Sequence, residues 1–552
     1  MKNLEQNYIS ILEQSIKNNW EKSALTDYKG ISLRYKDLAV KIEKIHIMLE
    51  EAGIQRGDKI ALCNKNCSNW AVAFLSIITY GAVVVPILPD FTEEQMLNIL
   101  KHSESKLFFT NIHLKSKEKT DFIIIELDTL TPRTKTNKEL VEATEKLNLL
   151  FGQKYPKDFT PKDVSYYQPD ADDLALINYT SGSTGNSKGV MLPYKALWSN
   201  VVFVEEHIGR KCRKDAVLLS ILPMAHMYGL AIEFLAQITY GTHIYFLTKI
   251  PSPTVIFTAM AEIKPTLIIS VPLILEKAVR KMIMPELDNI RIKTLLRLPV
   301  ISKKIRDSIR EKLQNAFGGR FYEVIIGGAS LSSDVETLLH QIGFNYTVGY
   351  GTTECAPLIS FADWKEAKIG SCGKAVDRME VKIDSPDPHH VVGEILCKGD
   401  NLMIGYYKNE EETKRAIDSE GWYHTGDLGI IDNDGFLFIR GRCKNMILGP
   451  SGQNIYPEEI EDKLNAMQLV SESVVIHKDS KLYGLVYLDP DEVKLLEQNN
   501  GSLSETLELV RKELNADLPA YEQLVGLKVM PTEFEKTPKK SIKRYLYFNE
   551  PV

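Results

Sequence analysis

Apolar, β-branched runs alternate with amphipathic stretches along the chain up to about residue 440. The apolar runs predict strands over Lys59–Leu62, Leu107–Thr110, Phe122–Leu127, Val217–Leu222, His243–Leu247, Thr266–Val271 and Tyr322–Ile326. The stretches between them predict helices over Phe91–His102, Ser199–Glu206 and Ser332–Gln341. Strands that alternate with helices indicate an α/β fold with mostly parallel sheets.

The pattern changes near Arg442. Before it, Gly393–Lys398 and Gly435–Arg440 predict short antiparallel strands that are separated by Asp and Gly turns. After it, the pattern predicts two helices and two strands, over Pro457–Leu464, Ser504–Ala516, Ser473–His477 and Tyr483–Leu488. We therefore expect a large domain over residues 1–443 and a small α+β domain over residues 444–552.

Composition narrows the class of protein. The 552 residues include 67 Lys+Arg and 73 Asp+Glu, and this slightly acidic balance gives no reason to expect a nucleic-acid partner. Seven scattered cysteines without a CxxC pair are typical of free thiols in a reducing cytosol. The uncharged stretch Trp70–Leu88 approaches the length of a membrane span, but Gly81 and Pro86 interrupt it. We expect a cytoplasmic protein in which this stretch forms a helix and a buried strand.

A loop rich in Gly, Ser and Thr carries the strongest local signal. It follows the apolar run Leu174–Tyr179 and consists of Thr180, Ser181, Gly182, Ser183, Thr184, Gly185, Asn186, Ser187, Lys188 and Gly189. Its glycines allow a close approach to an anion, its hydroxyl and amide groups can donate to phosphate oxygens, and Lys188 adds a positive charge. The Walker A spacing is absent, which excludes a P-loop NTPase. The loop indicates either a phosphate site or a plain flexible turn.

Two other segments could contact the same ligand. Gly349, Tyr350, Gly351, Thr352, Thr353 and Glu354 combine close backbone approach, hydroxyl donors and a carboxylate that could hold Mg²⁺. Gly327 and Gly328 end an apolar strand and could leave room for a flat ligand. Both segments are also compatible with ordinary turns at the ends of strands.

Three further features are ambiguous. Asp427 could accept hydrogen bonds from a ribose diol or be a solvated turn residue. His226 follows the predicted strand Val217–Leu222 and could be catalytic or a core histidine. The basic segment Lys536–Arg544 could be a solvated or a lipid-facing run.

The motifs YTSGSTGNSKGV, LPMAHMYG, GGASL, GYGTTE, GWYHTGDLG, GRCKNMI and the basic segment occur in this order. Together they resemble the adenylate-forming superfamily of acyl-CoA synthetases, adenylation domains and luciferases, from about residue 20 to residue 546. GYGTTECAPLIS and the segment 448–460 look like those of bacterial long-chain fatty acid:CoA ligases. The resemblance implies a large N-terminal domain of two αβ layers plus a β-barrel, and a small mobile C-terminal domain.

The resemblance also implies a role for each motif residue. Ser181, Ser183, Thr184 and Lys188 would hold the β- and γ-phosphates of ATP. Tyr350 would stack on adenine, Thr353 would meet the α-phosphate and Glu354 would bind Mg²⁺. Asp427 and Arg442 would hold the ribose, and Lys444 matches the hinge between the domains. His226 would lie beside the acyl carboxylate, and Gly327 and Gly328 would line the adenine and acyl site.

The implied reaction has two steps. A fatty acid carboxylate attacks the α-phosphorus of ATP and releases pyrophosphate, and the thiol of coenzyme A then displaces AMP from the mixed anhydride. The thiol of an acyl carrier protein is an alternative acceptor. Peripheral contact with the inner face of the membrane is compatible with this function, because long-chain acids partition into bilayers.

The sequence departs from the family pattern at its end. The family usually ends with Thr-x-Ser/Thr-Gly-Lys-Ile-x-Arg, and aligning Thr537, Ile542 and Arg544 puts Ser541 at the Lys position and Lys540 at the Gly position. Either Lys540 substitutes after a local shift, or adenylation is impaired while thioester formation survives, or the residue has been altered. We hypothesise that Lys540 substitutes partly, and Ser541 also leaves open a binding protein with little turnover.

Overall fold

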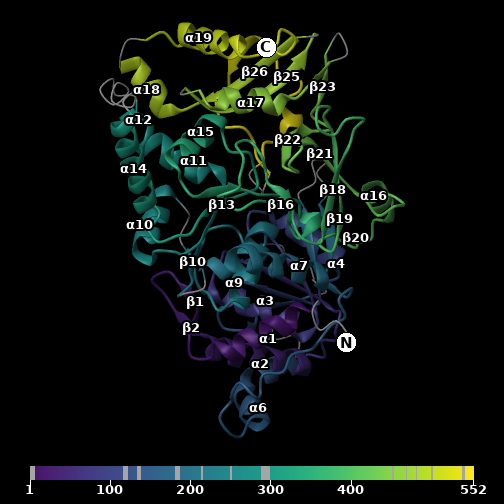
Figure 1. Ribbon diagram of the computed structural model, residues 1–552. Coiled ribbons are helices and arrows are strands. Elements are labelled where there is room, and N and C mark those ends of the chain that lie inside the picture. The colour runs from purple at the N-terminus through teal and green to yellow at the C-terminus, as the bar shows by residue number, and fades with distance from the viewer. Residues whose placement is uncertain are drawn as a thin grey trace.

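Two parts of unequal size make up the computed structural model (Figure 1). It describes residues 7–115, 122–133, 138–180, 187–212, 215–248, 252–287, 299–449, 453–467, 469–479, 481–498, 501–537 and 541–552. The C-terminal part, drawn in yellow-green and yellow, lies at one end of the molecule and contacts the large part through the segment around β22 (Leu437–Arg442) and α17 (Pro457–Asn465).

The first layer of the large part is an eight-stranded sheet. In spatial order its strands are β20 (Gly405–Tyr406), β9 (Lys188–Pro193), β8 (Leu174–Thr180), β4 (Val83–Pro86), β3 (Lys59–Cys63), β5 (Leu107–Thr110), β6 (Ile123–Glu126) and β7 (Thr131–Pro132). The five strands from β8 to β6 are parallel, whereas β9, β20 and β7 run antiparallel to their neighbours. The predicted strands in this region are confirmed to within a residue or two.

The second layer consists of two sheets linked by a bridge between Leu218 and Leu267. One has the order β10 (Val217–Ser220), β11 (His243–Phe246), β1 (Ser23–Asp27) and β2 (Ser32–Arg34). The other is parallel, with the order β12 (Ile268–Ser270), β13 (Val324–Ile326) and β14 (Tyr346–Val348). The expected α/β fold with two layers is therefore present.

Helices cover and separate these layers. They are α1 (Tyr8–Asn18), α2 (Tyr35–Glu51), α3 (Ser68–Tyr80), α4 (Glu93–Ser103), α5 (Lys138–Glu145), α6 (Leu147–Lys154), α7 (Tyr194–Val204), α8 (Arg210–Cys212), α9 (Ala236–Thr239), α10 (Pro253–Ile263), α11 (Pro272–Met282), α12 (Met284–Leu287), α14 (Pro299–Ala316) and α15 (Ser333–Ile342). Two segments are π-helical, η2 (Glu205–Gly209) and η3 (Gly229–Leu235). The helix predicted over Ser199–Glu206 begins earlier, at Tyr194, and passes into η2.

The uncharged stretch Trp70–Leu88 forms the predicted helix and buried strand. The helix α3 ends at Gly81, whose φ of 88° places it in the left-handed region that glycine adopts without strain. The following strand β4 is buried along its whole length within the eight-stranded sheet. Within the described part of the chain, no helix combines the length and apolar character that crossing a bilayer requires.

Two small antiparallel sheets complete the large part. One contains β15 (Tyr350–Gly351), β16 (Leu358–Phe361) and β17 (Lys374–Ala375), and the other contains β18 (Met379–Asp384), β19 (Gly393–Gly399), β21 (Tyr423–Ile431) and β22. A short helix, α16 (Glu410–Ala416), precedes β21, and a 3₁₀ turn, η4 (Thr353–Cys355), follows β15. Where a β-barrel is expected, the described strands thus pair as two open sheets and do not close.

The small part has its own sheet and core. Its sheet has the order β25 (Val470–Lys478), β26 (Lys481–Leu488) and β27 (Leu524–Val529). The other elements of the small part are α17, α18 (Pro490–Gln498), α19 (Leu503–Ala516), η5 (Arg544–Leu546) and a hairpin of β23 (Ile447–Leu448) and β24 (Asn454–Ile455). The main hydrophobic cluster extends from Tyr8 to Leu437, and the clusters of the small part begin at Ile455. The domain boundary at residues 443 and 444 falls between these clusters and stays a prediction.

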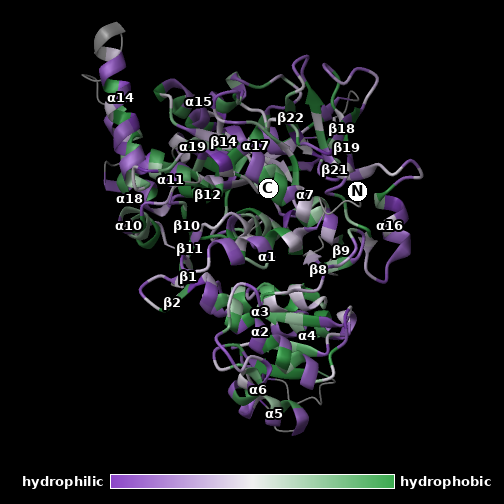
Figure 2. Ribbon diagram, turned by 60° about the horizontal axis from the view of Figure 1, so that its bottom comes forward, coloured by the Kyte–Doolittle hydropathy of each residue, from purple (hydrophilic) through white to green (hydrophobic). Residues whose placement is uncertain are grey.

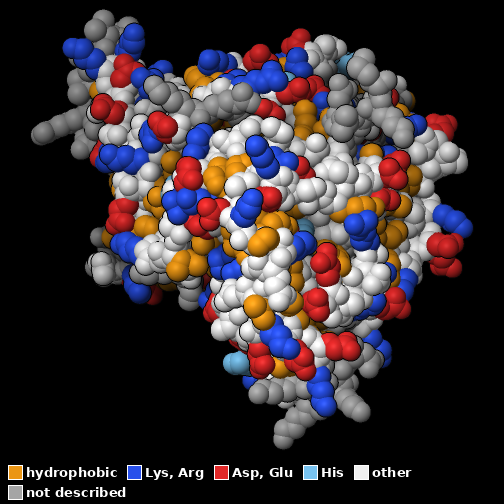
Figure 3. Space-filling view, turned by 90° about the horizontal axis from the view of Figure 1, so that it is seen from below, with side chains coloured by type: hydrophobic (Ala, Val, Ile, Leu, Met, Phe, Trp, Pro, Cys, Tyr) orange, Lys and Arg blue, Asp and Glu red, His pale blue; other side chains and the backbone are white. Residues whose placement is uncertain are grey.

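Hydropathy follows this architecture. Figure 2 shows α3 as mainly apolar, whereas the outlying helices α14 and α16 are mainly hydrophilic. On the face in Figure 3, lysines and arginines are interspersed with aspartates and glutamates, in keeping with the nearly balanced charge of the whole chain.

Candidate functional site

Three side chains from three strands form a hydrogen-bonded chain. The hydroxyl of Tyr350 in β15 donates a 2.7 Å hydrogen bond to Oδ2 of Asp427 in β21. Nε of Arg442 in β22 lies 3.0 Å from Oδ1 of the same carboxylate. Asp427 is only 6% exposed, so its interpretation as a solvated turn residue is wrong. Burial raises the pKa of Asp427, and Arg442 and the Tyr350 hydroxyl oppose that rise.

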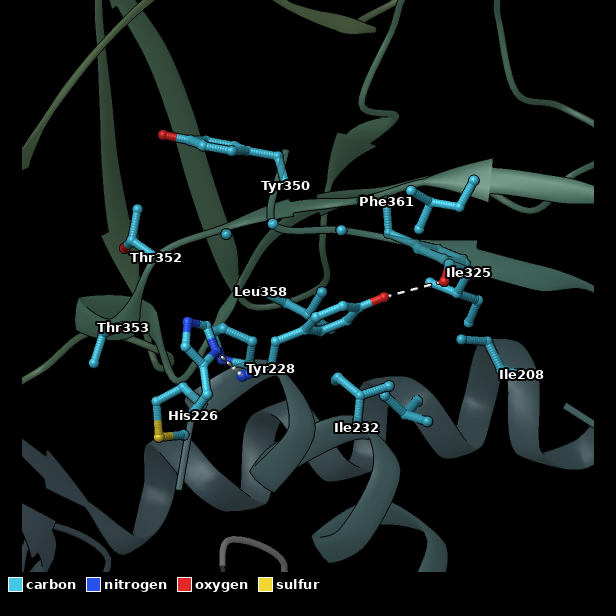
Figure 4. Close-up of a pocket in the computed structure, with 18 residues that line it drawn as sticks. Ile208, His226, Tyr228, Ile232, Ile325, Tyr350, Thr352, Thr353, Leu358 and Phe361 are labelled. Atoms are coloured by element: carbon cyan, nitrogen blue, oxygen red, sulfur yellow. Dashed lines mark hydrogen bonds between the residues drawn. The ribbon is translucent and has the colours of Figure 1, made fainter. Parts of the chain in front are cut away.

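Tyr350 borders an apolar cavity of about 60 Å³ (Figure 4). Eight of the residues singled out from the sequence line it, namely His226, Gly327, Gly328, Gly349, Tyr350, Gly351, Thr352 and Thr353. The rest of the wall is mainly aliphatic, and most of it comes from α7, η2, η3, β13 and β16. Segments more than a hundred residues apart in the sequence therefore meet around one cavity.

Glycines are required where the backbone comes close to other groups. A Cβ at Gly327 would lie 3.0 Å from Cζ of Tyr228, whose ring projects into the cavity. A Cβ at Gly351 would lie 2.1 Å from the carbonyl oxygen of Pro357, which is a direct collision. Gly328 has a φ of +87°, a conformation that other residues adopt only with strain.

The loop that carries His226 is held by two buried or half-buried asparagines. Asn66 donates to the carbonyl of Leu222 at 2.6 Å and accepts from the N–H of Met224 at 2.9 Å. Asn178, in β8, donates to the carbonyl of Ala225 at 3.0 Å. These bonds join the His226 loop to the first layer, and His226 itself lies at the cavity wall with Nδ1 accepting from the N–H of Tyr228 at 3.3 Å.

A buried carboxyl group supports the same loop from behind. Glu233, in η3, is fully buried and accepts hydrogen bonds from the Ser220 hydroxyl at 2.8 Å and from the N–H groups of Ile221 and Leu222. Burial raises the pKa of Glu233 to about 8, although these three donors oppose the shift. The end of β10 is thus attached to η3 by one side chain.

Another positively charged side chain, that of Lys188, lies at the hairpin of β8 and β9. Thr180 and Lys188 are directly opposite each other in these antiparallel strands. Nζ of Lys188 forms an ion pair with Glu412 of α16 and lies 5.0 Å from the ring centre of Tyr406. The Tyr406 hydroxyl in turn donates to Oε1 of Glu354 at 2.9 Å.

This arrangement suits a magnesium ion that is shared with phosphates. Glu354 is half-buried and offers one carboxylate, and Mg²⁺ commonly takes one or two carboxylates while substrate phosphates supply other ligands. The hydroxyl oxygen of neighbouring Thr352 is buried and has no hydrogen-bond partner among the described residues. A phosphate oxygen beside Thr352 could accept from its hydroxyl, and a magnesium ion would pair with the carboxylate of Glu354.

Other predicted site residues are placed less directly. Ser181, Gly182, Ser183, Thr184, Gly185 and Lys540 lie outside the described residues. Burial lowers the pKa of Lys444, with Arg442 and Lys188 acting in the same direction and Asp427 opposing them. The backbone carbonyl of Ser541 accepts from the N–H of Thr537, and the side chain of Arg544 pairs with Glu461, so these contacts stay within the small part.

Sequence reasoning missed several residues that shape the site. Glu412, Tyr406, Asn66, Asn178 and Glu233 were not singled out, because none belongs to a motif with a recognisable spacing. Except for Glu233, each acts through a partner that is distant in the sequence, as Lys188 and Glu412 do at a separation of 224 residues. Only the charge of Glu233 in an otherwise apolar helix could have drawn attention to it.

Comparisons with known proteins show the family of this chain. The family described as "AMP-binding enzyme" matches residues 12–407. A long-chain-fatty-acid–CoA ligase, FadD15 of Mycobacterium bovis, is 26% identical over 92% of this chain and 89% of its own length. 4-Coumarate–CoA ligase 1 of Solanum tuberosum is 28% identical over 80% of this chain and 76% of its own.

The fold also matches solved structures. O-succinylbenzoate coenzyme A synthetase (MenE) from Bacillus subtilis, in complex with ATP and magnesium ion, superimposes with a TM-score of 0.74 at 21% identity. The match covers 97% of this chain and 98% of that one. The chain therefore belongs to the AMP-binding enzyme family and, within it, to the adenylate-forming acyl-CoA ligases.

Proposed function

We propose that this protein converts a fatty acid into its coenzyme A thioester, with an acyl-adenylate as the intermediate. The observation that carries the proposal is the connection between the Tyr350–Asp427–Arg442 chain and an apolar cavity that also contains His226 and Thr353. One end of this site offers polar groups to a nucleotide, and the other offers aliphatic side chains to an acyl group. FadD15, a long-chain-fatty-acid–CoA ligase, favours a fatty acid as the acyl substrate.

The nucleotide would be bound at the polar end. The ring of Tyr350 would stack on adenine, and its hydroxyl would keep Asp427 in place for the ribose hydroxyls. Arg442 holds the second carboxylate oxygen and would contribute to the same ribose contact. Lys188 and the adjoining loop with Thr180 would bind the phosphates, where a cation and backbone N–H groups match their charge.

The reacting groups would meet between these two ends. Thr353 would contact the α-phosphate, and His226, held by Asn66 and Asn178 through its loop, would orient the acyl carboxylate. A carboxylate oxygen would then attack the α-phosphorus with loss of pyrophosphate, so the main task of the protein is positioning. Glu354 would hold Mg²⁺, which would neutralise phosphate charge when bound.

The second step would use the movement of the small part about Lys444. The thiol sulfur of coenzyme A would attack the acyl carbonyl carbon, and AMP would leave with the electrons of the broken bond. Rotation of the small part would exchange the groups that face the site between the two steps, which is a gating role.

The experiment is to measure pyrophosphate release with ATP, Mg²⁺ and a series of acids, with and without coenzyme A. We expect release that depends on octanoate or palmitate, and the matching acyl-CoA by mass spectrometry. Release with 4-coumarate or o-succinylbenzoate but with no fatty acid would overturn the proposed acyl class. Thioester formation only on an acyl carrier protein would overturn coenzyme A as the acceptor.

Matched variants test the nucleotide site. Asp427→Ala removes the carboxylate that Tyr350 and Arg442 hold, and we expect it to abolish most of the release. Asp432→Ala is the control, because Asp432 pairs with Lys368 on the turn after β21 and lies outside the cavity lining. Equal activity in the two variants would show that Asp427 does not bind the nucleotide.

A further inference from the structure

A second cavity adjoins the one that we assign to the acyl group. It has a volume of about 450 Å³ and is lined by Phe203, His207, Lys211, Tyr322, Phe361, Ala362, Asp363, Lys365, Glu366, Lys374, Ala375 and Asp377. Of the described residues that line the two cavities, Phe361 alone belongs to both. The two spaces are therefore separated at this residue.

The remainder of the partition is the end of α7 and the π-helical segment η2. Val204 and Ile208, four residues apart, line the first cavity. Phe203 and His207, also four residues apart, line the second. Positions with this spacing share one face of a helix, so the helix presents one face to each cavity.

Phe361 is held in the partition by packing alone. Its side chain is 7% exposed and packs edge to face on Phe203, with ring centres 5.9 Å apart. Phe203 stacks in turn on His207 at 4.3 Å. A Cβ at Gly349 would lie 3.6 Å from Cδ2 of Phe361, so a larger side chain there would press on the ring.

Phe361 stands where it would limit the length of an acyl chain that enters the first cavity. Figure 4 shows His226 and Thr353 at one end of the first cavity, and Phe361, Ile325 and Ile208 at the other. The first cavity, at about 60 Å³, has room for only a few water molecules. A chain that starts at His226 and grows beyond a few carbons therefore needs a wall residue to move.

Tyr228 is a less suitable candidate for that movement. Its hydroxyl is fixed by hydrogen bonds to the carbonyl oxygens of Ile325 at 3.1 Å and Ser270 at 3.4 Å. Rotation of Tyr228 would leave these groups to find other partners, whereas rotation of the Phe361 ring breaks no hydrogen bond. Removal of the Phe361 ring would also add the neighbouring space of about 450 Å³.

We propose that Phe361 determines the acyl chain length that the site accepts, because its ring separates the acyl cavity from the second cavity. This inference rests on the proposed function, since it takes the first cavity as the acyl site. Short acids end at the ring, and long acids displace it and place their distal carbons against Phe203 and Tyr322. Charged side chains complete this lining: Nζ of Lys211 pairs with Asp363 and lies 5.4 Å from the ring centre of Tyr322, so the apolar contacts for the chain come from the aromatic rings.

A smaller side chain at position 361 should open the partition between the two cavities, and a larger one should close it further. We expect Phe361→Ala to raise the ratio of kcat/KM for palmitate to kcat/KM for octanoate by about tenfold or more, because several methylene groups gain room. Phe361→Leu should raise this ratio by a smaller factor, and Phe361→Trp should lower it. An unchanged ratio in all three variants would overturn the proposal.

Controls separate this effect from a loss of stability. Ile359→Ala removes a fully buried side chain from the same strand, β16, and Ile359 lines neither cavity. It should lower the Tm, as Phe361→Ala does, but leave the palmitate-to-octanoate ratio unchanged. A similar change of ratio in Ile359→Ala would show that general loosening is responsible, and would also overturn the proposal.

A binding measurement keeps the inference testable if fatty acids are not turned over. Adenosine sulfamates that carry an octanoyl or a palmitoyl group mimic the intermediate without reacting, and their Kd values can be measured by calorimetry. The palmitoyl-to-octanoyl affinity ratio should rise in Phe361→Ala. A wild-type protein inactive with every fatty acid would contradict the proposed function, whereas an unchanged affinity ratio would contradict the role of Phe361.

Discussion

The hydroxyl of Tyr350 donates a 2.7 Å hydrogen bond to the buried carboxylate of Asp427, 77 residues further along the chain. This bond connects the aromatic ring proposed for adenine with the carboxylate proposed for ribose. Arg442 fixes the other oxygen of this carboxylate. Side chains that are held by such bonds lose less conformational freedom when a nucleotide binds.

Tyr350→Phe tests how much the hydrogen bond between Tyr350 and Asp427 contributes to ATP binding. A hydrogen bond to a charged group contributes about 1.5–3 kcal/mol, so we expect the KM for ATP to rise by roughly tenfold or more. Steady-state pyrophosphate release at varied ATP is the measurement. Tyr346→Phe is the control, because Tyr346 is also buried and near a carboxyl group, Glu336, but lies outside the cavity lining. An equal rise in the control would assign the effect to packing.

Glu412→Gln tests the ion pair at the hairpin of β8 and β9. Glu412 holds Lys188 in the structure, and the phosphates of ATP would have to compete for the same ammonium group. Because a partly exposed pair contributes about 0.2–1 kcal/mol, we expect ATP to bind up to about fivefold more tightly in the variant. Calorimetric titration of ATP at low salt measures this change.

The neighbouring Glu411 provides the control for that experiment. Its side chain is exposed and its ion pair is with Arg415, so Glu411→Gln should leave the affinity for ATP unchanged. Weaker ATP binding in Glu412→Gln would mean that Glu412 positions Lys188 for the phosphates and does not compete with them.

Glu233 predicts a dependence of stability on pH. Burial raises its pKa from the ordinary value of 4.5 to about 8, so over this interval the folded state holds a proton that the unfolded state releases. The free energy of unfolding should consequently fall as the pH rises from 4.5 to about 8. In Glu233→Gln this fall should be shallower, as measured by chemical denaturation at a series of pH values.

Other buried acids contribute to the same trend. Burial raises the pKa of Glu323 to about 8 and that of Glu461 to about 7, so the slope should decrease in Glu233→Gln without vanishing. Glu94→Gln, at an exposed site in α4, should keep the slope of the wild type. Identical slopes in all three proteins would contradict the assignment to Glu233.

Ser541→Lys tests the departure at the end of the chain. A lysine at this position would supply the cation that the family pattern places near the reacting phosphate, and we expect adenylation to accelerate by about tenfold or more. Lys540→Ala should slow the same step if Lys540 partly substitutes. Rapid-quench measurement of pyrophosphate release separates adenylation from thioester formation, and an unchanged rate in Ser541→Lys would exclude an impaired site.

Local patterns in the sequence were sufficient for the elements and for the motifs. The strand predicted over Leu107–Thr110 has those bounds in the structure, and the helix predicted over Pro457–Leu464 ends one residue later. The glycines at positions 327 and 351 were also identifiable, because the need for a close backbone approach is expressed in the residue itself. The bounds of strands and helices depend on interactions within a few residues, which the sequence displays directly.

Tertiary structure decided which distant residues meet. The bond between Tyr350 and Asp427, the pairing of Lys188 with Glu412 and the place of Phe361 between two cavities join segments whose sequences give no sign of contact. The closed barrel expected from the resemblance was likewise replaced by two open sheets in the described residues. Strand order and side-chain packing set these relationships, and they emerge only when the whole chain is folded.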